Sequence, residues 1–105
     1  MLTAIVKSQV IQKRIIVTDP DTKGTSLDPI AMGNLMRVEA QLLDTFEVLD
    51  KYDVKARAQK KNIDINNCFG KSCLLQLGSV CEANFVLNGT MEEYEKNITT
   101  TIYFN

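Results

Sequence analysis

The sequence predicts an α/β (α+β) domain: a mixed sheet of about four strands, two main helices packed on it, and a β-hairpin at its end. Three observations support this class. A β-branched strand at 14–18 leads into an amphipathic helix at 28–44, a second amphipathic helix occupies 72–83, and alternating segments at 85–94 and 98–104 flank a polar turn. The 105 residues are 45% apolar and 24% charged, which is the composition of one globular domain.

The first strand and the first helix have clear boundaries. Arg14–Thr18 is a β-branched run that Asp19-Pro20-Asp21 ends. Asp28 can cap a helix, and Pro29 fits its first turn because the N–H that proline lacks would have no partner there. We expect this helix to end near Asp44.

One side of this helix carries large apolar side chains at helical spacing, while Arg37, Glu39 and Gln41 fall toward the other side. We expect the apolar stripe to face the core. Its residues are Ala31, Leu35, Val38 and Leu42, widened by Met32, Met36 and Leu43.

The rest of the chain adds a strand, two helices and two strands. Phe46–Leu49 is a short strand, and the polar, cation-rich Asp50–Lys61 is expected to form a short and largely exposed helix. Ser72–Ala83 is the second amphipathic helix, and Phe85–Tyr94 and Ile98–Phe104 form the hairpin. The apolar face of the second amphipathic helix consists of Leu74, Leu75, Leu77 and Val80.

The composition argues against most catalytic and metal chemistry. The chain has no His, so it lacks the commonest general base and most zinc sites. Gly70-Lys71-Ser72 resembles the end of a P-loop, but Ile65 stands where that motif needs its first glycine. Asp19 and Asp21 lack the third acidic residue and the distal Glu of a calcium loop. We therefore predict no enzyme activity, no cofactor, and no catalytic, cofactor-binding or metal-binding residue.

The charges leave one alternative function open. Twelve Lys and Arg against thirteen Asp and Glu give a net charge of −1, which argues against a general binder of nucleic acid or anionic membranes. The densest cations, Lys51–Lys61, suggest as the alternative a cytosolic module that binds RNA or a nucleotide. Asp50, Asp53 and Asp64 stand among these cations and Tyr52 is the only aromatic residue there, so a solvated helix face is favoured. No segment approaches the roughly 18 apolar residues of a membrane span.

The three cysteines also leave alternatives. Cys68 and Cys73 are separated by four residues, which does not match a thioredoxin-type motif, and three Cys without His cannot complete a zinc site. The pair is either a local disulfide, which requires Cys68 to lie in the loop before the helix, or two reduced thiols. Cys81, at helical spacing behind Leu77, is expected to be a small core residue.

Several segments carry a resemblance to a known family. Ile15-Ile-Val-Thr-Asp19 is an apolar strand that ends in Asp, and Phe46-Glu-Val-Leu-Asp50 has the pattern of a second strand. After the cysteine pair, Ala83-Asn-Phe-Val-Leu87 leads to Gly89-Thr90. Over about residues 14–104 the chain resembles bacterial envelope domains related to the curli secretion-channel protein CsgG and to the amino-terminal domain of TolB.

The resemblance implies a single domain over 14–105 that acts without catalysis, as a protein-interaction or scaffold module of a cell-envelope protein. The resemblance implies a location in the periplasm or at the outer membrane. The alternative function, binding of RNA or a nucleotide, implies a location in the cytoplasm. Residues 1–13 would be an N-terminal extension or the remnant of a signal peptide. Together with the short spacing, the family pattern favours a disulfide between Cys68 and Cys73, with Cys81 as a buried free thiol.

The final strand is the expected contact surface. Its outward-facing residues, Thr99, Thr101 and Tyr103, carry no charge, and Ile98–Phe104 contains no Lys or Pro to protect the edge. Such an edge is a template for strand addition by a protein partner or by a second copy. The competing expectation is that the apolar residues of Met1–Gln12 cover this edge.

Overall fold

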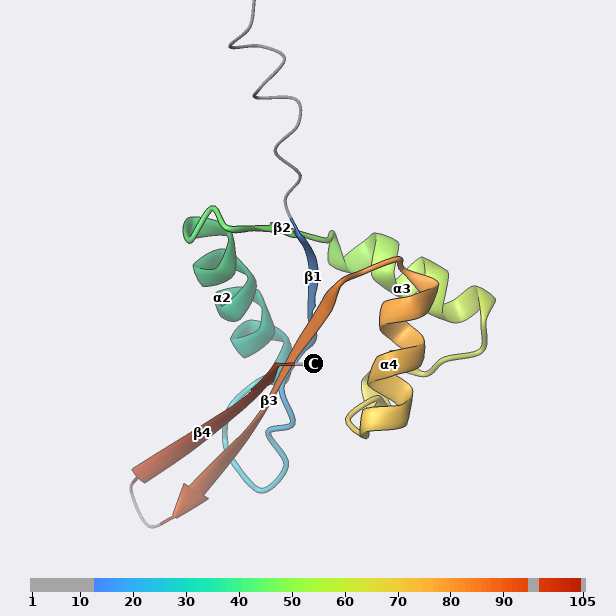
Figure 1. The fold of residues 1–105 in the computed structure, drawn as a ribbon. Helices are drawn as coiled ribbons and strands as arrows, with labels where there is room; N and C mark the ends of the chain where they lie inside the picture. Colours follow the sequence, from blue (N-terminus) through green and yellow to red (C-terminus); the bar gives the residue numbers. More distant parts are fainter. Residues whose placement is uncertain (1–12, 95–96, 105) are drawn as a thin grey trace, which may run out of the picture.

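The computed structural model describes residues 13–94 and 97–104, and the side chains of residues 13–93. Helices and strands alternate along most of this part of the chain (Figure 1). In chain order the elements are β1 (Lys13–Val17), α2 (Pro29–Leu42), β2 (Phe46–Val48), α3 (Lys51–Lys60), the 3-10 helix η1 (Ile65–Asn67), α4 (Lys71–Val80), β3 (Phe85–Tyr94) and β4 (Asn97–Phe104). The predicted α/β class is confirmed. The prediction of an extension over 1–13 falls outside the described residues, apart from Lys13.

The sheet has the strand order β2-β1-β3-β4. β1 is parallel to both of its neighbours, with Ile15 opposite Val48 of β2 and opposite Phe85 of β3. β4 runs antiparallel to β3, from the pair Tyr94 and Asn97 to the pair Leu87 and Phe104. Within the described residues, β1 therefore lies inside the sheet, and β2 and β4 form its two edges.

The helices lie on opposite sides of the sheet, α2 on one side and α3 and α4 on the other (Figure 1). The side of α3 and α4 contains a continuous hydrophobic core. The buried residues of this core are Ile16, Val54, Ala58, Cys68, Leu74, Leu77, Cys81 and Val86. The helix α3 is largely exposed, as expected from the sequence, but its two buried residues, Val54 and Ala58, join this core, so three helices cover the sheet.

The helix α4 approaches β3 closely. A Cβ added at Gly78 would lie 3.2 Å from Cγ2 of Val86, so only glycine leaves room for this contact without a shift. Leu74 and Leu77 are buried, as expected, whereas Leu75 is exposed. No helix within the described ranges is long and apolar enough to cross a membrane.

The face of α2 that packs on the sheet is not the one expected from the sequence. Most of the expected stripe points outward: Leu35, Val38 and Leu42 are 55%, 50% and 73% exposed, and Ala31 and Leu43 are exposed as well. Only its two methionines, Met32 and Met36, are half-buried. They lie beside the buried Gly33 and Ala40 and the half-buried Arg37, none of which was expected to face the sheet.

Two contacts explain this rotation of α2. A Cβ at Gly33 would overlap the carboxylate of Asp19, so the absence of a side chain lets the helix settle against the end of β1. On the same side of α2, Nε of Arg37 donates a hydrogen bond to the carbonyl oxygen of Val17, 3.0 Å away. A small residue and a polar anchor thus fix the helix, and the large apolar residues are left on its outer side.

Candidate functional site

A cleft opens at the carboxyl ends of β1 and β2. β1 continues through the loop at 18–28 into α2, and β2 continues through Leu49 and Asp50 into α3. Because α2 and α3 depart to opposite sides of the sheet, the strand ends between them stay uncovered, and open α/β sheets generally bind ligands at such a place. The cleft has a volume of about 650 Å³, within the range of roughly 300–1,000 Å³ that is common for ligand sites.

Cations and rings dominate the walls of the cleft. The β1–α2 loop, the inner side of α2, the start of α3 and the loop around η1 all contribute residues. The charged and aromatic residues of the lining are Asp19, Asp21, Lys23, Arg37, Lys51, Tyr52, Lys55 and Phe69.

The floor of the cleft is a hydrogen-bonded cluster around Arg37. Its Nη2 lies 2.7 Å from Oδ1 of Asp19 and its Nη1 donates to Oδ1 of Asn34 at 2.9 Å. The same Asn34 oxygen accepts a hydrogen bond of 3.0 Å from Nζ of Lys51, so Asn34 links α2 to the start of α3. Because Arg37 and Asp19 neutralise each other, the remaining charged residues of the lining are Asp21 and three lysines, Lys23, Lys51 and Lys55, so the net charge of the cleft is positive.

Two lysines lie over aromatic rings. Nζ of Lys51 is 5.2 Å from the ring centroid of Tyr52, and Nζ of Lys23 is 5.8 Å from that of Phe69. Both distances are within the roughly 6 Å over which a cation and a ring face attract each other. Tyr52 is 70% exposed. The cleft therefore presents an apolar surface and a positive charge side by side at two places.

A disulfide positions Phe69. Cys68 and Cys73 are bonded, with a Cα–Cα distance of 5.4 Å, in agreement with the pairing predicted from the sequence. Cys68 lies in the loop after η1 and Cys73 in the first turn of α4, so the bridge closes the loop that holds Phe69 at the cleft. Cys81 is a buried free thiol away from this site, and desolvation raises its pKa against the opposing charges of Arg57 and Arg14.

The other motifs of the sequence do not form sites. Gly70 is the N-cap of α4, and Lys71 and Ser72 after it are exposed. Asp21 accepts a hydrogen bond from the backbone N–H of Lys23, and Asp19 is paired with Arg37, so no calcium loop forms. Nowhere in the described part of the chain do three His, Cys, Asp or Glu side chains gather as metal ligands would.

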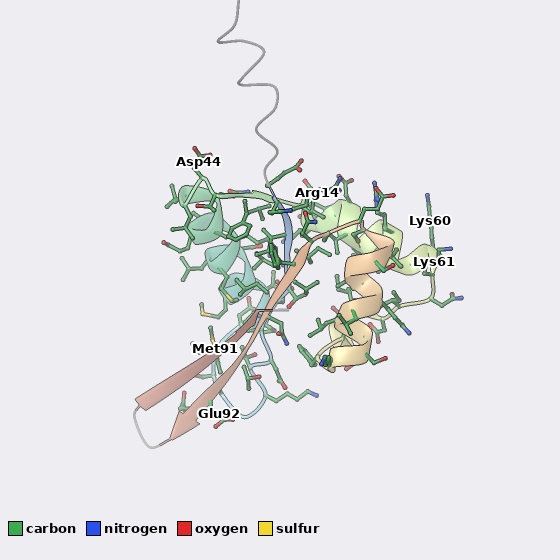
Figure 2. The ribbon with its side chains drawn as sticks, in the orientation of Figure 1. Arg14, Asp44, Lys60, Lys61, Met91 and Glu92 are labelled. Atoms are coloured by element: carbon green, nitrogen blue, oxygen red, sulfur yellow. A yellow bond between two sulfur atoms is a disulfide. The ribbon has the colours of Figure 1, made fainter. Side chains whose placement is uncertain are left out.

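The basic segment Lys51–Lys61 is not one surface. Lys51 and Lys55 line the cleft. Lys60 and Lys61 lie at the other end of α3, away from the sheet (Figure 2). The cleft could not be predicted from the sequence because its lining residues come from four separate segments. The one signal was Arg37, a cation on the face of α2 that also contains the buried Gly33 and Ala40.

A second feature is the apolar outer side of α2, which we call the α2 outer face. It consists of Leu35, Val38, Leu42 and Leu43, each at least half exposed. Ile30, which is 55% exposed, lies on the same helix and also lines the cleft.

The predicted contact edge can be located only by its backbone. β4 is an edge strand of the sheet. The side chains of Thr99, Thr101 and Tyr103 lie outside the described ones, as do residues 1–12, which were the competing cover for this edge.

Comparisons with known proteins relate the chain to one fold. No family model and no curated protein sequence matches it. Among solved structures it is similar to the LpoB C-terminal domain from Escherichia coli, with a TM-score of 0.70 and 13% identity over 99% of this chain and 80% of that chain. It is also similar to the LpoB C-terminal domain from Salmonella enterica, with a TM-score of 0.64 and 10% identity over 99% and 91% of the two chains.

These likenesses correct the family resemblance drawn from the sequence. The structural neighbours are LpoB C-terminal domains, not CsgG or the amino-terminal domain of TolB, so that assignment is wrong. The residues on which it was based, such as Ile15–Asp19 and Ala83–Leu87, form a buried parallel strand pair and its boundaries. Such strands need apolar and turn residues in any small sheet of this kind, so the pattern does not separate one family from another. The chain has the fold of the LpoB C-terminal domain.

Proposed function

We propose that this chain is a non-catalytic protein-interaction or scaffold domain of a bacterial cell-envelope protein, in the periplasm or at the outer membrane. Two findings support the proposal. Its fold is that of the C-terminal domain of LpoB, an outer-membrane lipoprotein whose domain is regulatory rather than enzymatic. Its described side chains contain no convergent set of nucleophile, base and stabilising group.

The α2 outer face is the observation that carries the proposal. Leu35, Val38 and Leu42 recur on one side of the helix and remain at least half exposed, although the helix itself is packed on the sheet. Contiguous apolar surface of this kind marks interaction sites in soluble domains. Covering the exposed half of each side chain would stabilise a complex by on the order of 1 kcal/mol per residue.

The test is site-specific photo-crosslinking in cells that produce the envelope protein. A photoreactive phenylalanine analogue is placed at Val38, on the α2 outer face, or at Lys60, an exposed residue at the far end of α3. We expect a discrete adduct with another protein at Val38 and none at Lys60, and loss of the Val38 adduct when Leu35→Glu is added. Equal adducts at both positions, no adduct, or only an adduct of two copies of this chain would contradict the proposal.

We also propose that the edge of β4 takes part in association, through a partner strand or a second copy. The topology supports this, since among the strands of the described residues β4 pairs only with β3. Light scattering over a range of concentrations should show association in the intact chain and its loss in Thr101→Lys, because a charged edge resists strand addition. A monomer that associates only when residues 1–12 are removed would show that those residues protect the edge.

The alternative function is a cytosolic module that binds RNA or a nucleotide. Calorimetry with ATP and GTP in the presence of Mg²⁺ distinguishes it from the proposed one. We expect no saturable binding with a Kd below about 1 mM, a free energy of about −4 kcal/mol. Micromolar binding that Lys51→Ala abolishes would favour the alternative.

A further inference from the structure

We propose that the cleft at the carboxyl ends of β1 and β2 binds an acidic segment of the partner protein. A carboxylate of that segment would lie between Lys51 and Lys55 on one wall and Lys23 on the other, and an adjacent apolar side chain would cover Tyr52 and Phe69. The inference rests on the proposed function, because it takes the partner to be a protein.

The charges of the cleft favour an anionic ligand. Of its two carboxylates, Asp19 is occupied by Arg37 at 2.7 Å and Asp21 accepts the backbone N–H of Lys23. Lys23, Lys51 and Lys55 have no carboxylate within 4.0 Å among the described side chains. Three lysines without a paired carboxylate thus line one hollow, and together with Arg37 these four cations outnumber the two carboxylates of the lining, Asp19 and Asp21.

The helix N-termini in the cleft favour a carboxylate held by side chains over a phosphate held by the backbone. Phosphate sites commonly use free N–H groups at a helix start. Here Asp50 already accepts from the N–H groups of Tyr52 and Asp53, at 2.7 and 3.3 Å, and Asp28 accepts from that of Ile30 at 3.1 Å. These caps occupy the backbone donors that a phosphate would use.

The walls of the cleft fit a peptide that combines acidic and apolar residues. Lys51 and Lys55 are one helical turn apart on α3, so both can reach the same carboxylate. The exposed ring of Tyr52 and the half-buried Phe69 and Ile65 offer apolar surface beside them. The disulfide holds Phe69 in place in the free protein, which lowers the entropy lost on binding.

The N-terminal segment does not match the charge of the cleft. Met1–Gln12 contains Lys7 and no Asp or Glu, so it cannot neutralise the lysines of the cleft. Charge complementarity favours an acidic segment of a partner over this segment as the occupant.

The experiment is a titration of the full chain followed by backbone amide chemical shifts. The probes are a blocked pentapeptide, Asp-Phe-Glu-Leu-Asp, its charge-reversed analogue Lys-Phe-Lys-Leu-Lys, and inorganic phosphate at matched ionic strength. We expect the acidic peptide to shift the amides of Lys23, Tyr52 and Phe69 and to bind about tenfold or more tightly than the other two probes.

A matched pair of charge reversals tests the position of the site. Lys51→Glu with Lys55→Glu should weaken binding of the acidic peptide by about tenfold or more. Lys60→Glu with Lys61→Glu changes the net charge equally on the same helix but away from the cleft, and should change binding less than twofold. Equal loss in both variants, equal binding of the basic peptide, tighter binding of phosphate, or no binding would overturn the inference.

The result is separable from the test of the proposed function. If the Val38 adduct forms and the acidic peptide does not bind, the cleft inference fails and the proposed function stands. If the peptide binds in the cleft and no adduct forms at Val38, the cleft is shown to bind acidic peptides, but the proposed function fails and with it the assignment of the occupant to a partner protein.

Discussion

Arg37 and Gly33 have complementary roles in the position of α2. The guanidinium of Arg37 bonds to the end of β1 through Val17 and to the following loop through Asp19. Gly33 leaves the space in which the Asp19 carboxylate lies. Arg37 thus binds α2 to the end of β1, and Gly33 leaves room for the helix to lie close to it.

Gly33→Ala is expected to destabilise the fold by about 1–2 kcal/mol. Overpacking of the Asp19 carboxylate costs about 1–3 kcal/mol, and the better helix propensity of alanine offsets at most about 1 kcal/mol of this. Urea denaturation measures the loss. In an Asp19→Ala background the same substitution should cost less, because the overlapping carboxylate is absent, and strictly additive effects would contradict this explanation.

Cys81 should make stability depend on alkaline pH. Burial raises the pKa of its thiol in the folded protein, so the unfolded chain releases this proton first as pH increases. The contribution of the neutral Cys81 thiol to the free energy of unfolding is fully present below the pKa of an unfolded-chain thiol, about 8.5. This contribution is lost as the pH rises through the higher pKa of the folded state. The free energy of unfolding should therefore fall more steeply above about pH 8 in wild type than in Cys81→Ala, and parallel curves would argue against it.

At the scale of elements, the chain leaves α2, α3 and α4 in the same way. Two positions after the last residue of each helix stands a residue with positive φ that is not glycine. These residues are Asp44, Asn62 and Glu82, with φ of 54°, 58° and 54°. After α4, the N–H groups of Glu82 and Ala83 bond to the carbonyl oxygens of Ser79 and Gly78, which is a Schellman motif. Glycine is the residue that usually occupies this position, because a Cβ is unfavourable there.

Glu82→Gly is therefore expected to stabilise the fold by about 1 kcal/mol, since the side chain is exposed and only backbone strain is removed. Asn62→Gly is the control, and should give a smaller gain because asparagine tolerates positive φ. Thermal unfolding measures both. Destabilisation by Glu82→Gly would mean that the Glu82 side chain makes a stabilising contact that outweighs the strain.

The disulfide between η1 and α4 should stabilise the fold by about 2 kcal/mol, because it closes a short loop in the unfolded chain. Cys68→Ala with Cys73→Ala should lower the free energy of unfolding by at least this amount. Reductant should destabilise wild type similarly and leave the double variant unchanged. Rapid alkylation of all three cysteines in protein taken from its native compartment would contradict the bridge.

The helix α2 also shows what a periodic pattern leaves undecided. Apolar residues recur at 31, 35, 38 and 42, but the residues at 33, 36, 37 and 40 have helical spacing too, and Met36 also belongs to the wider predicted stripe. Size and hydropathy favoured the first set. The second set packs on the sheet because Gly33 and Arg37 make specific contacts with Asp19 and Val17. These partners lie outside the helix, so the spacing of residues within the helix does not reveal the contacts.

For the whole molecule, local signals predicted the elements well and their assembly poorly. The β-branched run at 14–18 and the Asp–Pro start of α2 carry their own boundary signals, and the structure places strand and helix there. The residues that line the cleft come from the β1–α2 loop, α2, α3 and the η1–α4 loop, so no short sequence pattern predicts it. These residues come together only when the sheet has formed.

The central place of β1 has a consequence for how the chain folds as it is made. Arg14 and Asn84, joined by a hydrogen bond of 2.8 Å, are 70 residues apart, and Ile15 pairs with Phe85. During synthesis from the N-terminus, β1 emerges first and β2 follows, but the side of β1 that pairs with β3 has no partner strand until much later. Contacts so distant in sequence form slowly, and an unpaired strand edge is open to mispairing in the meantime. The central strand of the finished sheet is thus only half paired during much of synthesis.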